Sequence, residues 1–146
     1  MKQLLLIAAL SVGLIACSKD DDTAPTPAPT KLELLTGKQW QYTELYINAT
    51  AHKTGTLAYK RGNAGNAQNQ DNTRTFFWQD GVFDEVDGVS STHTKMQWAF
   101  SNADNTKYKM IWPTGNTEVE IILLTDTKFE WFNPTQKMSA VMTATK

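Results

Sequence analysis

The chain has 146 residues, of which 40% are hydrophobic and 20% are charged. Its five Trp, six Phe and four Tyr are more than a disordered chain would leave in water, so we expect a folded domain. Lys and Arg number 14 against 15 Asp and Glu, and this balance provides no basic surface for nucleic acid, which we therefore exclude as a partner.

The first sixteen residues have the pattern of an export signal. Lys2 precedes an apolar run over residues 4–15, and the small Ala16 follows that run. A membrane-spanning helix needs about 20 apolar residues, so this run is too short to be one. We therefore expect residues 1–16 to be a signal peptide that is cleaved before Cys17.

Residues 14–17 read Leu-Ile-Ala-Cys and resemble the lipobox of bacterial lipoproteins. The resemblance implies that Cys17 carries diacylglycerol and a further acyl chain such as palmitate, which together anchor the protein stably to a membrane. Cys17 is also the single cysteine of the chain. A lipid-linked sulfur is unavailable as a nucleophile, metal ligand or disulfide partner. The alternative is an ordinary signal peptide followed by a free cysteine.

Residues 17–30 have the composition of a tether. The acidic run at residues 18–22 resembles the surface-export signal of Bacteroidota lipoproteins, which implies an outer-membrane location at the cell surface; the alternative is a plain solvated charge run. Pro25, Pro27 and Pro29 favour an extended polyproline II spacer. Thr23 stands in a three-residue sequence that resembles the O-glycosylation motif of the same bacteria.

From residue 31 onward, apolar residues recur at every second position, as they do in half-buried strands. Turn signals separate the runs, including Asp80-Gly81 and Asn133-Pro134. We therefore predict an all-β domain over residues 31–146, with a short helical turn near residues 32–35. About eight antiparallel strands would form an up-and-down meander that closes into a barrel, and a β-sandwich is the alternative. The strands are expected at residues 38–47, 73–78, 82–86, 95–100, 108–112, 118–124, 128–132 and 137–143.

Residues 49–72 do not fit this pattern, because they are polar and rich in Gly, Asn and Ala. A connection of this length is typically a mobile loop or a lid over a binding site. Leu57 and Tyr59 within it are candidates for a small strand, or for packing onto the barrel mouth.

Several segments between residues 34 and 143 resemble the lipocalin-like lipoprotein domains of Bacteroidota. The resemblance implies an eight-stranded barrel with an apolar interior, and no defined ligand for most members. The matching segments are residues 35–40 (Leu-Thr-Gly-Lys-Gln-Trp), Phe76-Phe77 with residues 80–83 (Asp-Gly-Val-Phe), residues 97–100 (Gln-Trp-Ala-Phe), residues 121–125, and residues 128–131 (Lys-Phe-Glu-Trp).

No pattern of catalytic residues appears in the chain. His52 and His93 are its two histidines, neither lies in a metal-binding spacing, and no Gly-x-Ser-x-Gly motif is present. Four carboxylates cluster around one hairpin, where Asp favours local turn hydrogen bonds; a weak calcium site there is the alternative. We therefore expect no enzyme activity, no metal and no cofactor. These carboxylates are Asp80, Asp84, Glu85 and Asp87.

Aromatic residues at alternating positions of different strands are the candidate binding groups. A barrel of eight strands either fills with side chains or holds one small ligand. If a cavity exists, we expect a small apolar or amphipathic molecule in it. The alternative is a filled core whose surface, including an outward Trp78, binds an envelope protein or a glycan. The residues predicted to line the cavity are Trp40, Trp98, Phe100, Tyr108 and Trp131.

Overall fold

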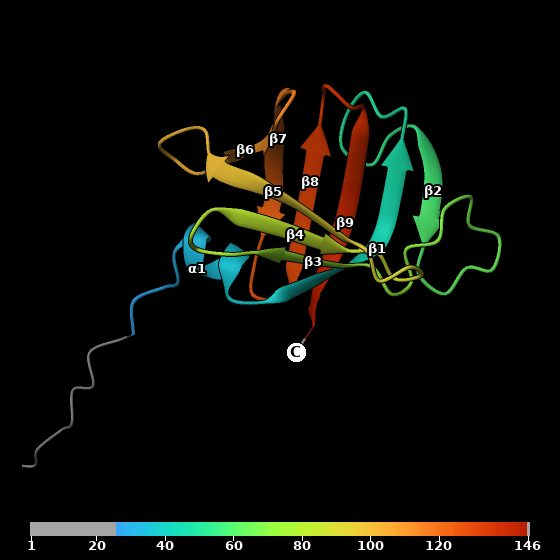
Figure 1. The fold of residues 1–146 in the computed structure, drawn as a ribbon, viewed down its shortest axis with the longest axis horizontal. Coiled ribbons are helices and arrows are strands. Elements are labelled where there is room, and N and C mark those ends of the chain that lie inside the picture. Colours follow the sequence, from blue (N-terminus) through green and yellow to red (C-terminus); the bar gives the residue numbers. More distant parts are fainter. Residues whose placement is uncertain (1–25, 146) are drawn as a thin grey trace, which may run out of the picture.

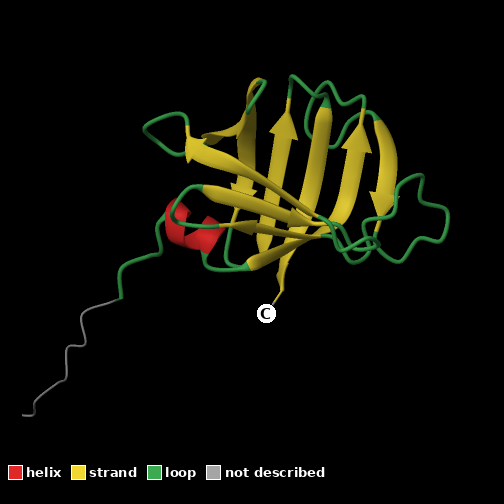
Figure 2. Cartoon of the chain, in the orientation of Figure 1, coloured by secondary structure: helices red, strands yellow, loops and turns green. Residues whose placement is uncertain are grey.

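The computed structural model describes residues 26–145, which form one short helix and nine strands (Figure 2). The predicted signal peptide, Cys17 and Thr23 lie outside these residues. The elements are α1 (Lys31–Thr36), β1 (Gln39–Ile47), β2 (Thr56–Lys60), β3 (Arg74–Phe77), β4 (Val82–Val86), β5 (His93–Phe100), β6 (Lys107–Trp112), β7 (Gly115–Leu124), β8 (Lys128–Asn133) and β9 (Met138–Thr145).

Eight of the strands close into a barrel. Strands β3 to β9 follow one another antiparallel, and β9 then pairs along β1, from Gln39 opposite Thr145 to Ile47 opposite Met138. In Figure 1, β3, β4 and β5 cross in front of the sheet that contains β7, β8, β9 and β1. The pairing of β1 with β9 closes the sheet on itself, whereas a β-sandwich would consist of two separate sheets. The predicted meander barrel is therefore confirmed, and the sandwich alternative is wrong.

Strand β2 is an addition to the barrel. It pairs with the second half of β1, from Glu44 to Ile47, while β3 pairs with the first half, from Gln39 to Gln41. The small strand suggested for Leu57 and Tyr59 is therefore confirmed as a ninth strand, within the segment otherwise expected to be a loop or lid. Strand β2 packs against the barrel through Tyr59, which is fully buried and donates a hydrogen bond to Asp71 at 2.8 Å.

Helix α1 covers the end of the barrel where β1 begins (Figure 1). A capping box fixes its start, because the Thr30 side chain accepts from the Glu33 amide while the Glu33 carboxylate accepts from the Thr30 amide. Its Leu35 is buried, and the Leu35 carbonyl accepts a hydrogen bond from Trp40 Nε1 at 2.9 Å. This end of the barrel is therefore closed by packed side chains.

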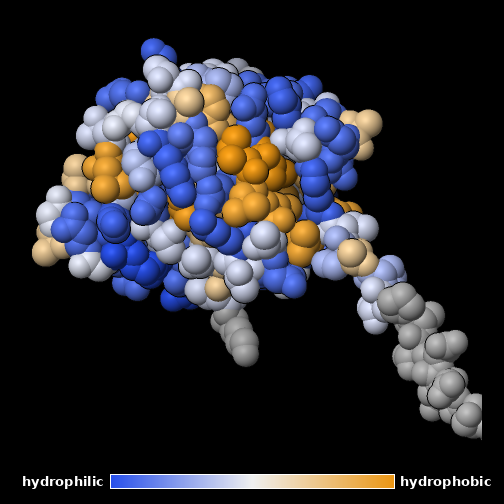
Figure 3. Space-filling model, turned by 180° about the vertical axis from the view of Figure 1, so that it is seen from behind, coloured by the Kyte–Doolittle hydropathy of each residue, from blue (hydrophilic) through white to orange (hydrophobic). Residues whose placement is uncertain are grey.

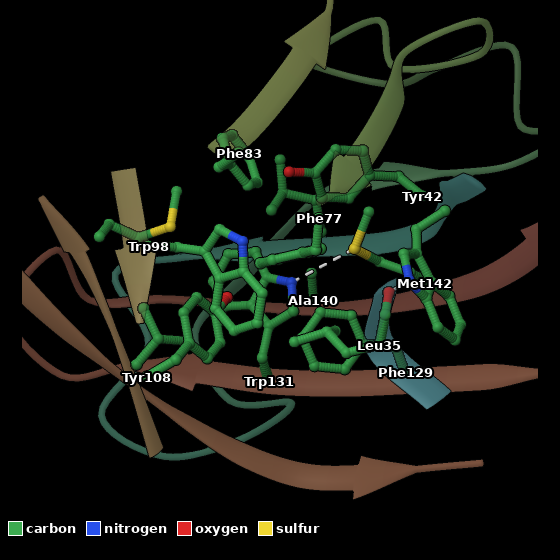
Figure 4. Close-up of a cluster of buried hydrophobic side chains, with 14 of the residues drawn as sticks. Leu35, Tyr42, Phe77, Phe83, Trp98, Tyr108, Phe129, Trp131, Ala140 and Met142 are labelled. Carbon is green, nitrogen blue, oxygen red and sulfur yellow. Dashed lines mark hydrogen bonds between the residues drawn. The ribbon is translucent and has the colours of Figure 1, made fainter. Parts of the chain in front are cut away.

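An aromatic cluster fills the interior next to α1 (Figure 4). Phe77 stands at its centre and meets four other rings edge-on, at centroid distances from 5.1 to 5.9 Å. Edge-to-face contacts of this kind place the positive rim of one ring against the negative face of another. The four partners are Phe83, Trp98, Tyr108 and Phe129.

Candidate functional site

A cavity of about 190 Å³ remains inside the barrel, on the side away from α1. Gln136 and Thr94 belong to its wall and are solvent-exposed, so the cavity reaches the surface beside the turn between β8 and β9. Alternation along the strands brings inward-facing apolar side chains to it. The apolar part of the wall includes Phe77, Phe83, Met96, Met110, Val119 and Met142.

Two of the five predicted binding residues, Tyr108 and Trp131, line this cavity. Trp131 is buried and its Nε1 donates to the sulfur of Met142 at 3.4 Å, the bond drawn in Figure 4. These two residues therefore have the placement that ligand binding requires, and their contact with a ligand stays a prediction.

The other three predicted residues do not line the cavity. Trp40 is fully buried beneath α1, and Trp98 donates from Nε1 to the carbonyl of Trp78 at 3.0 Å. Phe100 packs edge-on against Trp98 at a centroid distance of 5.3 Å. All three occupy inward-facing positions of their strands, but they lie nearer the end of the barrel that α1 closes. The prediction of one wall made of all five residues is therefore corrected.

One polar part of the wall consists of Thr117, Asn133 and Gln136, which are hydrogen-bonded to one another. The other centres on Glu85, which the sequence placed among the hairpin carboxylates. Its Oε2 accepts from the Tyr42 hydroxyl at 2.9 Å and from Thr75 Oγ1 at 3.4 Å. Burial raises the pKa of Glu85, and the hydroxyls of Tyr42 and Thr75 partly offset that shift. The place of Glu85 on the cavity wall could have been inferred from alternation, because Phe83 and Glu85 are two residues apart on one face of β4.

Two tyrosine hydroxyls border the same space. Burial, together with the nearby Glu85 carboxylate, raises the pKa of Tyr42 and the pKa of Tyr108 well above their ordinary value. Both hydroxyls therefore remain protonated far into the alkaline range and can donate hydrogen bonds. The arrangement can hold a small molecule that has an apolar body and a polar head.

Comparison with known proteins identifies the architecture. No family model and no curated protein matches the chain. Among solved structures, a lipocalin-like protein from Bacteroides uniformis aligns with a TM-score of 0.50 over 75% of this chain and 97% of its own, at 12% identity. The fold is lipocalin-like. This confirms the predicted resemblance at the level of the barrel.

The outer surface of the lipocalin-like barrel carries exposed apolar groups. Trp78 is 50% exposed and stacks on Phe76 with ring centroids 5.8 Å apart, as expected for residues that flank the inward Phe77. On β7, Ile122 and Leu123 are also exposed. In the view from behind, which faces the sheet containing β7, apolar atoms gather among hydrophilic ones (Figure 3). Such patches are candidates for contact with another macromolecule.

The two histidines of the lipocalin-like barrel lie beside different carboxylates. His93 Nδ1 is 3.0 Å from Asp84, and His52 Nε2 is 3.1 Å from Glu130. Within residues 26–145, no three His, Cys, Asp or Glu side chains are grouped so that they could hold a metal ion. In the same part of the chain, no helix is long and apolar enough to cross a membrane.

Glu130 attaches the connection between β1 and β2 to the outer face of the barrel. Its carboxylate pairs with Lys128, and with Lys53 at 3.4 Å, while the Lys53 amide donates to Ser139 at 3.1 Å. Burial opposes ionisation of Glu130, but the hydrogen bond from Lys128 and the charges of Lys53 and Lys128 outweigh it and hold its pKa below 4.5. Burial lowers the pKa of neighbouring His52 below 6.5, which favours the neutral imidazole.

Acid is expected to weaken this attachment. Stability from Glu130 is complete above pH 4.5 and is lost as the pH falls through the lower folded-state pKa; stability from neutral His52 is lost progressively below pH 6.5. Glu130→Gln should lower the free energy of unfolding at pH 7 by about 1 to 2 kcal/mol, and this difference should shrink toward acid pH. Urea unfolding at several pH values measures it.

A matched control for this prediction is Glu118→Gln. Glu118 is 42% exposed in its side chain and pairs with Lys107, so its removal changes the net charge equally with little loss of stability. Glu85 has a raised pKa and titrates with the opposite effect, so the quantity to compare is the difference between variant and parent. A Glu130→Gln difference that stays constant with pH would contradict the assignment.

Proposed function

We propose that this chain is a cell-envelope lipoprotein whose lipocalin-like barrel binds a small apolar or amphipathic molecule, without catalysis. The observation that carries the proposal is the cavity of about 190 Å³, with its largely apolar wall and the polar atoms around Glu85. Sites for small molecules typically have this composition, since apolar area supplies affinity and a few polar groups supply orientation.

The volume of the cavity limits the ligand. An apolar cavity of roughly 150 Å³ is enough for one benzene molecule. The space here therefore suits a single ring, or a short alkyl chain, with a small head group. A long acyl chain would not fit inside without displacing the aromatic cluster around Phe77.

The direction of the tether agrees with an envelope role. Residues 26–30 lead into α1, which lies away from the turn between β8 and β9 (Figure 1), and the cavity opens beside that turn. With lipid on Cys17, the opening would point away from the membrane. An acidic run and a proline-rich spacer between the lipid and the domain support placement on the outer membrane, at the cell surface.

Val119→Phe is expected to abolish ligand binding. Val119 is buried on the cavity wall, and a benzyl group there would occupy a large part of the available space. Native mass spectrometry of protein purified gently from its envelope should show an added mass on the parent that is absent from the variant. Overpacking costs about 1 to 3 kcal/mol, so circular dichroism must first show that the variant is folded. Equal added mass on both proteins would place the ligand elsewhere.

Cys17→Ala is expected to move the protein from the membrane fraction to a soluble fraction. The change removes the sulfur to which lipid would be attached, and two acyl chains contribute roughly 0.8 kcal/mol for each buried CH₂. Fractionation followed by immunoblotting measures the distribution, with Thr23→Ala as a control that leaves the anchor intact. Protease treatment of intact cells then tests surface exposure. Unchanged membrane association of Cys17→Ala would contradict the anchor.

The exposed Trp78, stacked on the half-buried Phe76, favours a second candidate function, docking onto an envelope protein or a glycan. The pair borders an open hollow of about 680 Å³ on the outside of the barrel, next to Lys38 and Asp126. Exposed aromatic rings of this kind stack on sugars and on partner side chains. Capture of an envelope component that depends on Trp78 and not on Val119 would favour docking over binding in the cavity.

A further inference from the structure

The cavity contains a carboxylate without a cation. Glu85 Oε2 accepts two hydrogen bonds, from Tyr42 and Thr75, whereas Oε1 accepts none from residues 26–145. No Lys, Arg or His side chain belongs to the wall of the cavity. An ionised carboxylate is costly in apolar surroundings unless it is paired, so a positive charge is the feature that this wall lacks.

A second polar atom in the wall also lacks a partner. Tyr108 is 3% exposed, and its hydroxyl forms no hydrogen bond with any residue from 26 to 145. In residues 26–145 the enclosed side-chain polar atoms without a partner are His52 Nε2 and Ser101 Oγ, so the Tyr108 oxygen is not enclosed and opens into the cavity. Its lone pairs could accept a hydrogen bond from a donor group on a ligand.

From these groups we infer that the cavity selects small molecules that carry a protonated amine, with Glu85 Oε1 as the counter-ion. The inference rests on the proposed binding function and specifies the class of its ligand. The ammonium group would donate to Glu85 and to the Tyr108 hydroxyl. The apolar body of the ligand would lie against Trp131 and Phe77, whose rings also attract a nearby cation.

Other head groups fit the wall less well. A carboxylate on the ligand would place a second negative charge beside Glu85, and Asp87 already adds repulsion at that carboxylate. A neutral alcohol could donate one hydrogen bond to Oε1 but would leave the charge of Glu85 uncompensated. An ammonium group supplies both the charge and several donors.

The test compares three probes with the same ring: benzylamine, benzyl alcohol and benzoate. Each is titrated into the full chain at pH 7 by isothermal calorimetry. We expect benzylamine to bind at least about tenfold more tightly than benzyl alcohol, and benzoate to bind most weakly. Val119→Phe should abolish binding of all three, which places them in the cavity.

Glu85→Gln should remove the preference for benzylamine over benzyl alcohol, because the glutamine side chain carries no charge. Tyr108→Phe should weaken benzylamine several-fold without changing the fold. Glu118→Gln is the matched control, since it removes one exterior carboxylate and should leave the preference intact. Persistence of the amine preference in Glu85→Gln would overturn the inference.

The outcomes separate this inference from the proposed function. Equal binding of the amine and the alcohol, or tighter binding of benzoate, would overturn the amine preference while leaving a ligand-binding barrel in place. Binding of none of the probes to the parent, combined with a bare protein mass in native mass spectrometry, would overturn both.

Discussion

Phe77→Ala is expected to lower the free energy of unfolding by about 3 to 5 kcal/mol, as for other buried aromatic residues. Phe77 is 2% exposed, and its ring is the common partner of Phe83, Trp98, Tyr108 and Phe129. Truncation removes all four edge-on contacts and leaves a void that the surrounding strands cannot close. Domains of this size have stabilities of about 5 to 15 kcal/mol, so much of the total would be lost.

Equilibrium urea unfolding, followed by tryptophan fluorescence, measures this effect. Phe76→Ala is the matched control, because the same ring is removed one residue earlier, on the outward face of β3, where Phe76 stacks only on the exposed Trp78. Its effect should be no more than about 1 kcal/mol. Similar losses for the two variants would mean that Phe77 is not the centre of the core.

Gly55→Ala is expected to lower the free energy of unfolding by about 3 kcal/mol, through two additive causes. Gly55 has a φ of +85°, a left-handed conformation that side chains disfavour. A methyl group there would also lie 2.4 Å from the Ile47 carbonyl oxygen and 2.9 Å from the Ala49 nitrogen, which are backbone atoms at the end of β1. The turn that leads into β2 would therefore have to open.

Gly62→Ala separates the two causes. Gly62 has a similar φ of +78°, but nothing lies within 4 Å of the position that its methyl group would take. It should therefore show only the conformational penalty, about 1 kcal/mol. Hydrogen exchange should report earlier opening of residues 48–60 in Gly55→Ala than in Gly62→Ala. Equal effects of the two substitutions would show that the close approach at Gly55 is absent in solution.

Local sequence patterns were sufficient for the barrel and its hairpins. Alternating apolar residues and the Asp80-Gly81 turn predicted the hairpin of β3 and β4, and Gly81 adopts the positive φ of +86° that such a turn uses. These signals are local, because a strand buries every second residue wherever it lies in the barrel. For the same reason, Tyr108 and Trp131 could be named as candidates for the barrel interior from their alternating positions, while the register decided which face their strands bury.

Depth along the barrel was decided by the tertiary structure. Trp40 and Tyr42 both face inward from β1, yet Trp40 packs beneath α1 while Tyr42 borders the cavity. Alternation carries no information on this distinction, which depends on strand tilt and on the stagger between neighbouring strands. The register shift between Tyr42 and Glu44 against β9 adds a further displacement that no periodic pattern contains.

Long-range pairing also determined β2 and the surroundings of Glu85. Tyr59 can be buried only because β1 offers a free edge beyond the point where β3 ends, and that edge is set by the closure of β1 onto β9. Glu85 stands in a sequence of carboxylates that resembles a solvated turn, but its register with Thr75 brings it inside the barrel. Periodicity and turn signals were thus enough for the eight strands of the barrel and for the alternation of their side chains. The tertiary structure decided how far along the barrel they lie, because depth follows from pairings between residues that are distant in the chain.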